Sequence, residues 1–145
     1  MNISTTRFGG VTIDETDVLT FVDGLIGMEE CRRWVLLADA QNSALAWLQS
    51  VDRPEVALAV VSPRRFVADY RVRVARRDIQ PLELDQPNDA QVLVIVSHSE
   101  GGLALNLKAP LVIHLDERLG RQVLARDDHA LQHWLPGTTK LRMTG

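Results

Sequence analysis

The stretch ALAWLQSVDRPEVALAVV at residues 44–61 decides the fold class, because it predicts two strands joined by a tight turn. Its first arm, residues 44–51, alternates between two faces, as is typical of a strand. Pro54 presets its own φ and Asp52 can bond its own backbone, which favours a turn. The β-branched run at residues 56–61 then leads back along the first arm. The stretch therefore predicts a β-hairpin.

The same two-residue period recurs along the rest of the chain. It predicts strands at residues 103–107 and 111–115, while short apolar runs predict others at residues 18–22, 34–38 and 92–96. A further strand is expected at residues 122–125. Gly101-Gly102 supplies the positive φ that a hairpin turn needs, and Gly120 opens another turn. Many short strands joined by turns predict one small all-β sandwich or barrel that spans residues 1–145 and contains little helix.

Two segments have no clear strand pattern. Residues 78–88 contain two prolines and predict a loop or a single helical turn. Residues 127–135 fit a short helix closed by Pro136-Gly137 and fit a strand equally well. The period of the apolar residues leaves both interpretations open.

Length and composition suit one independently folding unit. The chain has 145 residues, of which 46% are hydrophobic and 24% are charged, as is typical of a globular domain. The single cysteine, Cys31, excludes an intrachain disulfide and fits a reducing compartment. Residues 1–10 show no signal-peptide pattern, and the longest apolar runs fall far short of the roughly 18 residues that a membrane helix needs. We therefore expect a soluble cytoplasmic protein.

The sequence contains no arrangement that is typical of an enzyme. His129 and His133 lie four residues apart and could share a metal on a helix, but no glutamate stands between them as in metalloproteases. The chain has neither a glycine-rich phosphate loop nor a serine nucleophile elbow. We expect an inert Cys31, no catalytic residue, no metal and no cofactor.

Charge is unevenly distributed, although the net charge is only −3. Residues 64–77 hold six arginines against one acid, Asp69. Arginines in such number could neutralise RNA phosphates. They could instead form the wet face of a strand and pair with carboxylates on its neighbours.

The alternation within residues 70–77 favours the second interpretation, because it predicts a strand with arginines on one face. Its other face is expected to hold Tyr70, Val72 and Val74. The stretch also lacks the series of aromatic side chains on which single-stranded nucleic acids stack.

Several stretches, in order and spacing, resemble the FliW family of flagellar assembly factors. The most specific is LNLKAPLVI at residues 105–113, followed by GRQV at residues 120–123. FVDGLIGME at residues 21–29, LQS at residues 48–50 and the residues from Pro63 to Tyr70 agree as well. Together these stretches span nearly the whole chain.

This resemblance implies a fold and a binding role. The implied fold is a compact antiparallel β-barrel-like domain with neither catalysis nor a cofactor. Members of the family bind the translational repressor CsrA and relieve its repression of flagellin messenger RNA. They also bind flagellin as a chaperone. Met28 and His114 depart from the residues that are usual in the family.

Two groups of residues are expected to bind these partners. CsrA presents a basic surface to RNA, so acidic side chains of this chain are expected to steer it. The candidates are Asp14, Glu15, Asp17, Glu83, Asp85 and Asp89. The second group is an outward-facing patch of Asn106 and Lys108 beside Tyr70, because tyrosine suits interfaces.

Two alternatives stay open. The motif residues could serve the fold, with Asn106 bonding the backbone at a turn and Gly24 and Gly27 supplying turn geometry. The protein could also be a basic-faced β-barrel that binds messenger RNA directly. Pairing of the arginines in residues 64–77 with carboxylates would exclude direct RNA binding.

Overall fold

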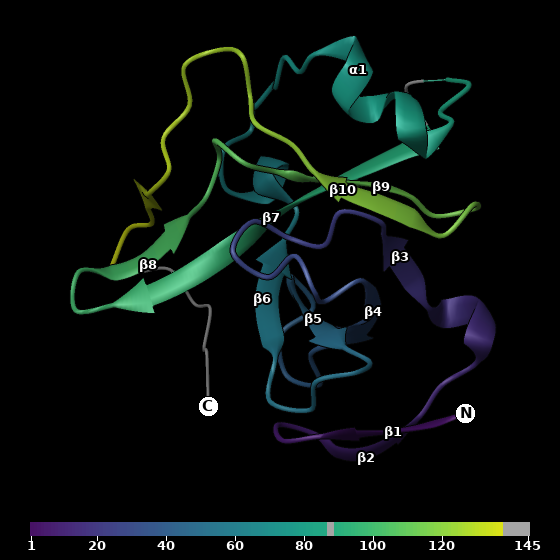
Figure 1. Cartoon of the computed structure of the whole chain (residues 1–145). Coiled ribbons are helices and arrows are strands. Elements are labelled where there is room, and N and C mark those ends of the chain that lie inside the picture. The colour runs from purple at the N-terminus through teal and green to yellow at the C-terminus, as the bar shows by residue number, and fades with distance from the viewer. Residues whose placement is uncertain (87–88, 138–145) are drawn as a thin grey trace.

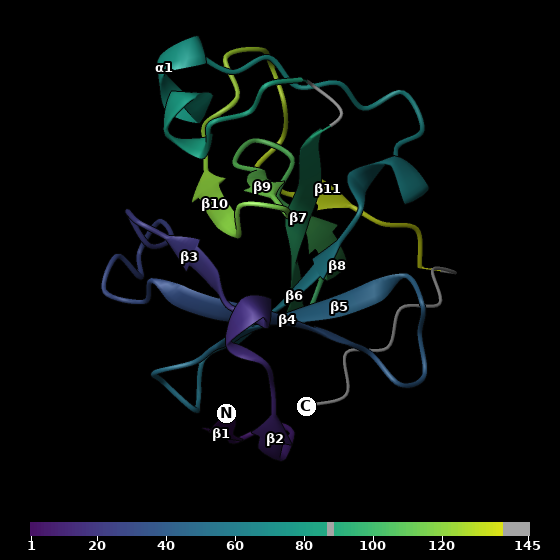
Figure 2. The same ribbon diagram turned by 90° about the vertical axis from the view of Figure 1, so that its right-hand side faces the viewer.

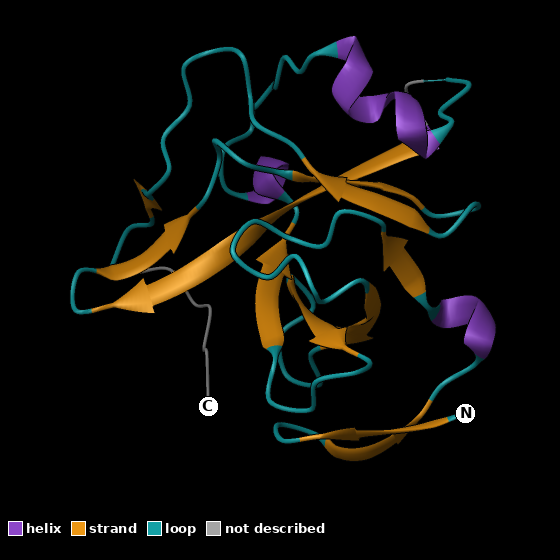
Figure 3. Ribbon diagram, viewed as in Figure 1, coloured by secondary structure: helices purple, strands orange, loops and turns teal. Residues whose placement is uncertain are grey.

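The structure, a computed structural model, describes residues 1–86 and 89–137 and consists mainly of strands (Figure 3). The strands are β1 (Asn2–Thr5), β2 (Gly9–Thr12), β3 (Leu19–Phe21), β4 (Arg33–Ala38), β5 (Leu45–Ser50), β6 (Ala57–Val61), β7 (Ala90–Ser99), β8 (Gly102–Leu105), β9 (Leu111–His114), β10 (Leu119–Gln122) and β11 (His133–Trp134). The helical turns are η1 (Glu15–Asp17), η2 (Pro63–Arg65), α1 (Arg76–Ile79) and η3 (Gln80–Leu82).

The largest sheet closes into a β-barrel (Figures 1 and 2). Its strand order is β11-β8-β7-β6-β5-β4-β3-β10-β9, and an additional pairing of β7 with β9 joins seven of these strands into a ring. All pairs are antiparallel except β3 with β10, which run parallel. The predicted all-β barrel is therefore confirmed, with one parallel seam. The separate hairpin of β1 and β2 was not predicted.

The hairpin of β5 and β6 forms as predicted, with Leu45 opposite Val61 and Gln49 opposite Ala57. Its turn is held by Ser50, whose Oγ accepts a hydrogen bond from the Arg53 N–H at 3.0 Å. The Asp52 side chain was expected to bond the backbone of this turn, but it does not. Its carboxylate pairs with Arg33 on the neighbouring β4.

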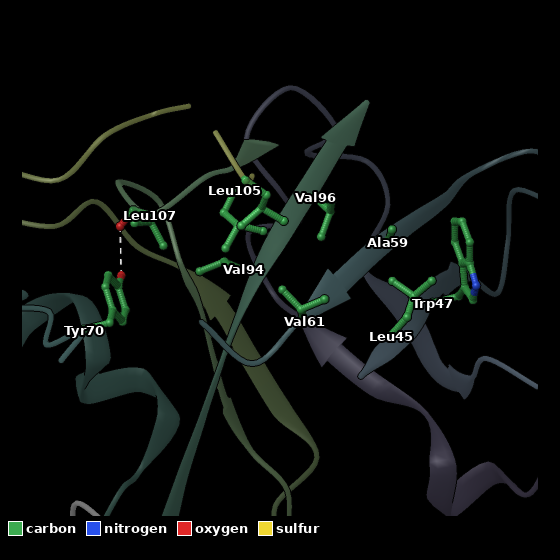
Figure 4. Packing of buried hydrophobic residues seen from close by; sticks show 10 residues of the cluster. Leu45, Trp47, Ala59, Val61, Tyr70, Val94, Val96, Leu105 and Leu107 are labelled. Atoms are coloured by element: carbon green, nitrogen blue, oxygen red, sulfur yellow. Dashed lines mark hydrogen bonds between the residues drawn. The ribbon is translucent and has the colours of Figure 1, made fainter. Parts of the chain in front are cut away.

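The barrel interior is filled from nearly every strand of the ring. The fully buried side chains that meet there include Leu19, Phe21, Trp34, Leu48, Val60, Leu111 and Ile113. A second core covers the outer face of β5, β6 and β7 and extends from Trp47 past Val61 and Val94 to Leu105, Leu107 and Tyr70 (Figure 4). Burial on both faces explains why β5 and β9 carry few polar residues.

The predicted strand at residues 70–77 is wrong. Tyr70 is buried, Val72 and Val74 are half-buried and the arginines are exposed, so the alternation itself is present. The backbone is hydrogen-bonded to residues 126–127 rather than to a strand, and α1 begins at Arg76. An alternating pattern shows only that a segment is extended over a core, whatever takes its hydrogen bonds.

Two smaller predictions also need comment. Residues 127–135 form no helix, and only His133–Trp134 pairs as a strand, with β8. Gly120 lies inside β10, while Arg118, with φ of 57°, makes the preceding turn. The strand predicted at residues 111–115 forms as β9, and all four of its residues are buried. Residues 78–86 form helical turns and a loop, and the prediction for residues 87–88 lies outside the described residues.

None of the helices in residues 1–86 and 89–137 has the length and apolar character needed to cross a membrane.

Candidate functional site

The predicted patch around Tyr70 is not an exposed surface. The Tyr70 side chain is only 4% exposed, and its hydroxyl donates a hydrogen bond to the Leu107 carbonyl oxygen at 2.8 Å (Figure 4). Burial, assisted by the charge of Asp127, raises the pKa of Tyr70 to about 12. The ring therefore belongs to the core, and the expectation that it is available to a partner is wrong.

The other two members of this patch are also tied to the backbone. The Asn106 Oδ1 accepts a hydrogen bond from the Ala109 N–H at 3.0 Å, which is the turn contact expected from the sequence. The Lys108 Nζ donates to the Asp127 carbonyl oxygen at 3.1 Å. Both side chains are half-buried. Their contacts support the structural interpretation of the motif, and a role in partner binding stays a prediction.

Replacing Tyr70 with phenylalanine is expected to lower the free energy of unfolding by about 1–2 kcal/mol. The substitution keeps the ring in the core but leaves the buried Leu107 carbonyl oxygen without its hydroxyl donor. Urea unfolding of the two proteins measures the difference. Partner binding should be unchanged, and a loss of binding in a stably folded variant would contradict the core role.

The predicted acidic docking face is divided between two places. Asp14, Glu15 and Asp17 are exposed at η1, which precedes β3. Glu83 and Asp85 are exposed and Asp89 is half-buried in the segment that follows η3. Figures 1 and 2 show η1 and η3 well separated in both views. The six acidic candidates therefore form two separate groups and not one face, and the role of either group in binding CsrA stays a prediction.

The arginines of residues 64–77 do not pair with carboxylates of the described residues, contrary to the expectation. None of them forms an ion pair with a carboxylate in the part of the chain that the structure describes. Arg64 donates its Nε–H to the Tyr70 carbonyl oxygen at 3.0 Å instead. The condition that would have excluded RNA binding is not met.

A side-chain network anchors this arginine-rich segment from residues 126–129. The Asp127 carboxylate accepts a hydrogen bond from the Arg73 N–H at 3.0 Å and lies 3.1 Å from the His129 Nε2. The Arg73 contact is the main reason that the pKa of Asp127 is lowered, and His129 assists. His129 thus helps to position the arginine-rich segment.

No group of three potential metal ligands occurs within residues 1–86 and 89–137.

Two of the motif stretches, residues 21–29 and residues 120–123, come together at the C-terminal end of β10. Arg121 pairs with Asp23 at 3.1 Å, and the Gln122 Oε1 accepts a hydrogen bond from the Ile26 N–H at 2.8 Å. The Gln122 Nε2 also donates to the Ala109 carbonyl oxygen at 3.1 Å. The Arg121 guanidinium donates to the Asp78 carbonyl oxygen at 2.8 Å, which ties α1 to the same place. Segments far apart in the chain are thereby held as one surface.

This surface exposes apolar side chains that a folded chain usually buries. Val22, Ile26 and Leu124 are 59%, 58% and 56% exposed. Val22 precedes Asp23, which pairs with Arg121, the Ile26 N–H bonds Gln122, and Leu124 follows Gln122 by two residues. We define the junction surface as Val22, Ile26 and Leu124 with Arg121 and Gln122. Clustered exposed apolar side chains mark interaction sites more often than isolated ones do. The motif residues were visible in the sequence, but their proximity was not.

The loop that carries Ile26 is rigidly built. Leu25 is 1% exposed and exchanges backbone hydrogen bonds with Met28, at 3.3 Å and 2.8 Å. Gly24 has φ of 65°, which favours glycine, and the Glu29 backbone lies against it. The expected structural role of Gly24 and Gly27 at this turn is therefore present, and it leaves Ile26 at the tip of the turn.

Comparisons with known proteins agree with the resemblance seen in the sequence. A model of the FliW protein family matches residues 2–135. The flagellar assembly factor FliW of Bdellovibrio bacteriovorus is 37% identical over 131 residues, which are 89% of this chain and 75% of that protein. The flagellar assembly factor FliW of Natranaerobius thermophilus is 32% identical over 137 residues, covering 92% of this chain and 91% of that protein.

The fold agrees as well. A crystal structure of the flagellar assembly factor FliW matches with a TM-score of 0.85 and 25% sequence identity, covering 96% of this chain and 100% of that chain. The similarity thus includes both the barrel and the stretches that build the junction surface. The chain belongs to the FliW family of flagellar assembly factors.

Proposed function

We propose that this protein acts by binding other proteins and not by catalysis. Its partners are the translational repressor CsrA, whose repression of flagellin messenger RNA it relieves, and flagellin, which it chaperones. Both interactions take place in the cytoplasm. The observation that carries the proposal is the family match over residues 2–135, together with an exposed apolar junction surface on a rigid barrel.

The junction surface supplies the docking site in this proposal. Val22, Ile26 and Leu124 offer apolar area that is already exposed in the free protein. Gln122 holds the Ile26 backbone and Arg121 pairs with Asp23 beside Val22, so little conformational entropy is lost in this loop when a partner binds. Apolar anchors on a preorganised surface are typical of binding hot spots.

Serine at Ile26 or Leu124 is expected to weaken binding of CsrA or flagellin by about tenfold or more, because burying such a side chain contributes about 1.5–3 kcal/mol. Leu131, which is 64% exposed and lies outside the junction surface, provides the matched control. Calorimetric titration of both purified partners with Ile26→Ser, Leu124→Ser and Leu131→Ser measures the effect. Wild-type protein that binds neither partner would overturn the proposal.

The acidic side chains at η1 offer a second route to CsrA. Asp14, Glu15 and Asp17 are exposed next to one another, and a basic partner would be steered toward them. Reversing all three to lysine is expected to slow association at low salt. An unchanged association rate would exclude this group and leave Glu83 and Asp85 to be tested in the same way.

Direct binding of messenger RNA is a second candidate function. It is favoured by the arginines of residues 64–77, which have no carboxylate partner among the described residues. Fluorescence titration with a flagellin leader RNA at two salt concentrations tests it. Micromolar affinity with a steep salt dependence would favour this candidate over CsrA binding.

A further inference from the structure

Two hollows are lined by arginines, and the larger one reaches Leu124 of the junction surface. One has a volume of about 650 Å³ and is lined by residues 75–78 and 124–126. The other has a volume of about 360 Å³ and is lined by residues 73–74 and 126–127. Arg126 lines both. We therefore treat them as one feature, the arginine groove, formed by residues 73–78 and 124–127.

The two walls of the groove are fixed to each other by backbone contacts. The Arg126 N–H donates to the Arg73 carbonyl oxygen at 2.6 Å, and the Arg73 N–H donates to Asp127 at 3.0 Å. The contact of Arg121 with the Asp78 carbonyl oxygen holds the far end. The groove is thus a preformed feature of the fold and requires no ordering before a ligand binds.

The groove carries more positive than negative charge, with four arginines against two acids in its lining. Its four arginines are exposed, and none forms an ion pair with a carboxylate of the described residues. They are Arg73, Arg76, Arg77 and Arg126. Two acids also line it, but Asp78 is half-buried and the Asp127 carboxylate is engaged by the Arg73 N–H and His129. In a chain with a net charge of −3, this is a local surface for a negatively charged ligand.

The rest of the lining favours a protein ligand over a nucleic acid. Val74, Ala75 and Ala125 line the groove, and the exposed Leu124 stands at its border with the junction surface. No aromatic side chain lines either hollow, whereas single-stranded nucleic acids bind chiefly by stacking on such rings. Guanidinium groups pair with carboxylates through two parallel hydrogen bonds, and an apolar side chain can lie on Leu124.

We propose that the arginine groove binds an acidic segment of a protein partner, in which aspartate or glutamate residues are interspersed with apolar ones. Its carboxylates pair with Arg73, Arg76, Arg77 and Arg126, and an apolar side chain contacts Leu124. This inference rests on the proposed function, because it assigns a chemistry to the partner segment that docks beside the junction surface.

The probe is a short fluorescein-labelled peptide that alternates glutamate with leucine, titrated by fluorescence anisotropy. The double variant Arg76→Glu/Arg77→Glu is expected to weaken its binding by about tenfold or more, since two charge-assisted pairs become repulsions. Leu124→Ser is expected to weaken binding several-fold. Arg65→Glu is the matched control, because Arg65 is an exposed arginine of η2 outside both hollows, and its affinity should equal that of the wild type.

A peptide with lysine in place of glutamate tests the sign of the charge and should not bind. Equal binding of the two peptides, or unchanged affinity in the double variant, would overturn the inference. The inference would also be overturned if a short single-stranded RNA bound more tightly than the peptide and the double variant abolished that binding. The groove would then be a nucleic-acid site. Thermal unfolding of each variant confirms that the fold is retained.

Parallel titrations with purified CsrA and flagellin separate this inference from the proposed function. Wild-type protein that binds a partner, with unchanged affinity in the double variant, would refute the groove alone. Wild-type protein that binds neither partner would refute the proposed function, and the peptide titration would still decide the chemistry of the groove.

Discussion

Alanine at Gly24 is expected to destabilise the protein by about 3 kcal/mol or more. The left-handed φ of 65° disfavours any residue with a Cβ by about 1–2 kcal/mol. An added Cβ would also lie 2.5 Å from the Glu29 carbonyl oxygen and 2.6 Å from its Cα. These are backbone atoms, so the strain cannot be relieved by a side-chain rotation and adds about 1–3 kcal/mol.

Gly27 in the same loop supplies the matched control. Its φ is 86°, but an added Cβ would meet nothing within 4 Å. Gly27→Ala is therefore expected to destabilise by only about 1 kcal/mol, from backbone conformation alone. Urea unfolding of both variants measures the difference. Equal effects at the two positions would contradict the close approach at Gly24.

Alanine at Gly120 is expected to destabilise by about 2–3 kcal/mol for a different reason. The φ of Gly120 is not positive, but a Cβ there would overlap the ring of Phe21, lying 2.5 Å from its Cε1. Phe21 is fully buried in the barrel interior, between β10 and the other strands. The ring has no free space to move into, since protein interiors are close-packed.

A double-mutant cycle identifies this contact. Phe21→Leu shortens the side chain and is expected to destabilise by about 1–2 kcal/mol by itself. In the double variant, the shorter side chain leaves room for the methyl group of Gly120→Ala. The double variant should therefore be destabilised by at least about 1 kcal/mol less than the sum of the two single variants. Strict additivity would show that the methyl group meets something other than the ring.

Gly24 and Gly120 belong to stretches by which the sequence resembles its family, and both serve the packing of the barrel. The same holds for Asn106 and Gln122, whose side chains bond the backbone at Ala109. The residues of the motif therefore serve the fold directly. In the proposed function, the docking site is what the motif holds in place, namely the exposed Ile26 and its neighbours on the junction surface.

The alternation of side chains sufficed to predict most of the sheet. The hairpin at residues 44–61 follows from alternation and a turn, and the strand within residues 92–96 follows from a short apolar run; both signals are local. The same signal failed at residues 70–77, because an extended segment can bury alternate side chains while hydrogen-bonding to a loop. Burial is recorded in the sequence, whereas the identity of the hydrogen-bonding partner is not.

By itself, the sequence determined the all-β class, the family and the arginine-rich stretch, because residue type, spacing and order carry that information. Only the tertiary structure decided which of these residues meet. It buried Tyr70, separated the two acidic groups, and joined Ile26 to Gln122 across 96 positions of the chain. The reason is that closing the barrel creates contacts between distant segments, and no local pattern in the chain specifies which surface residues that closure brings together.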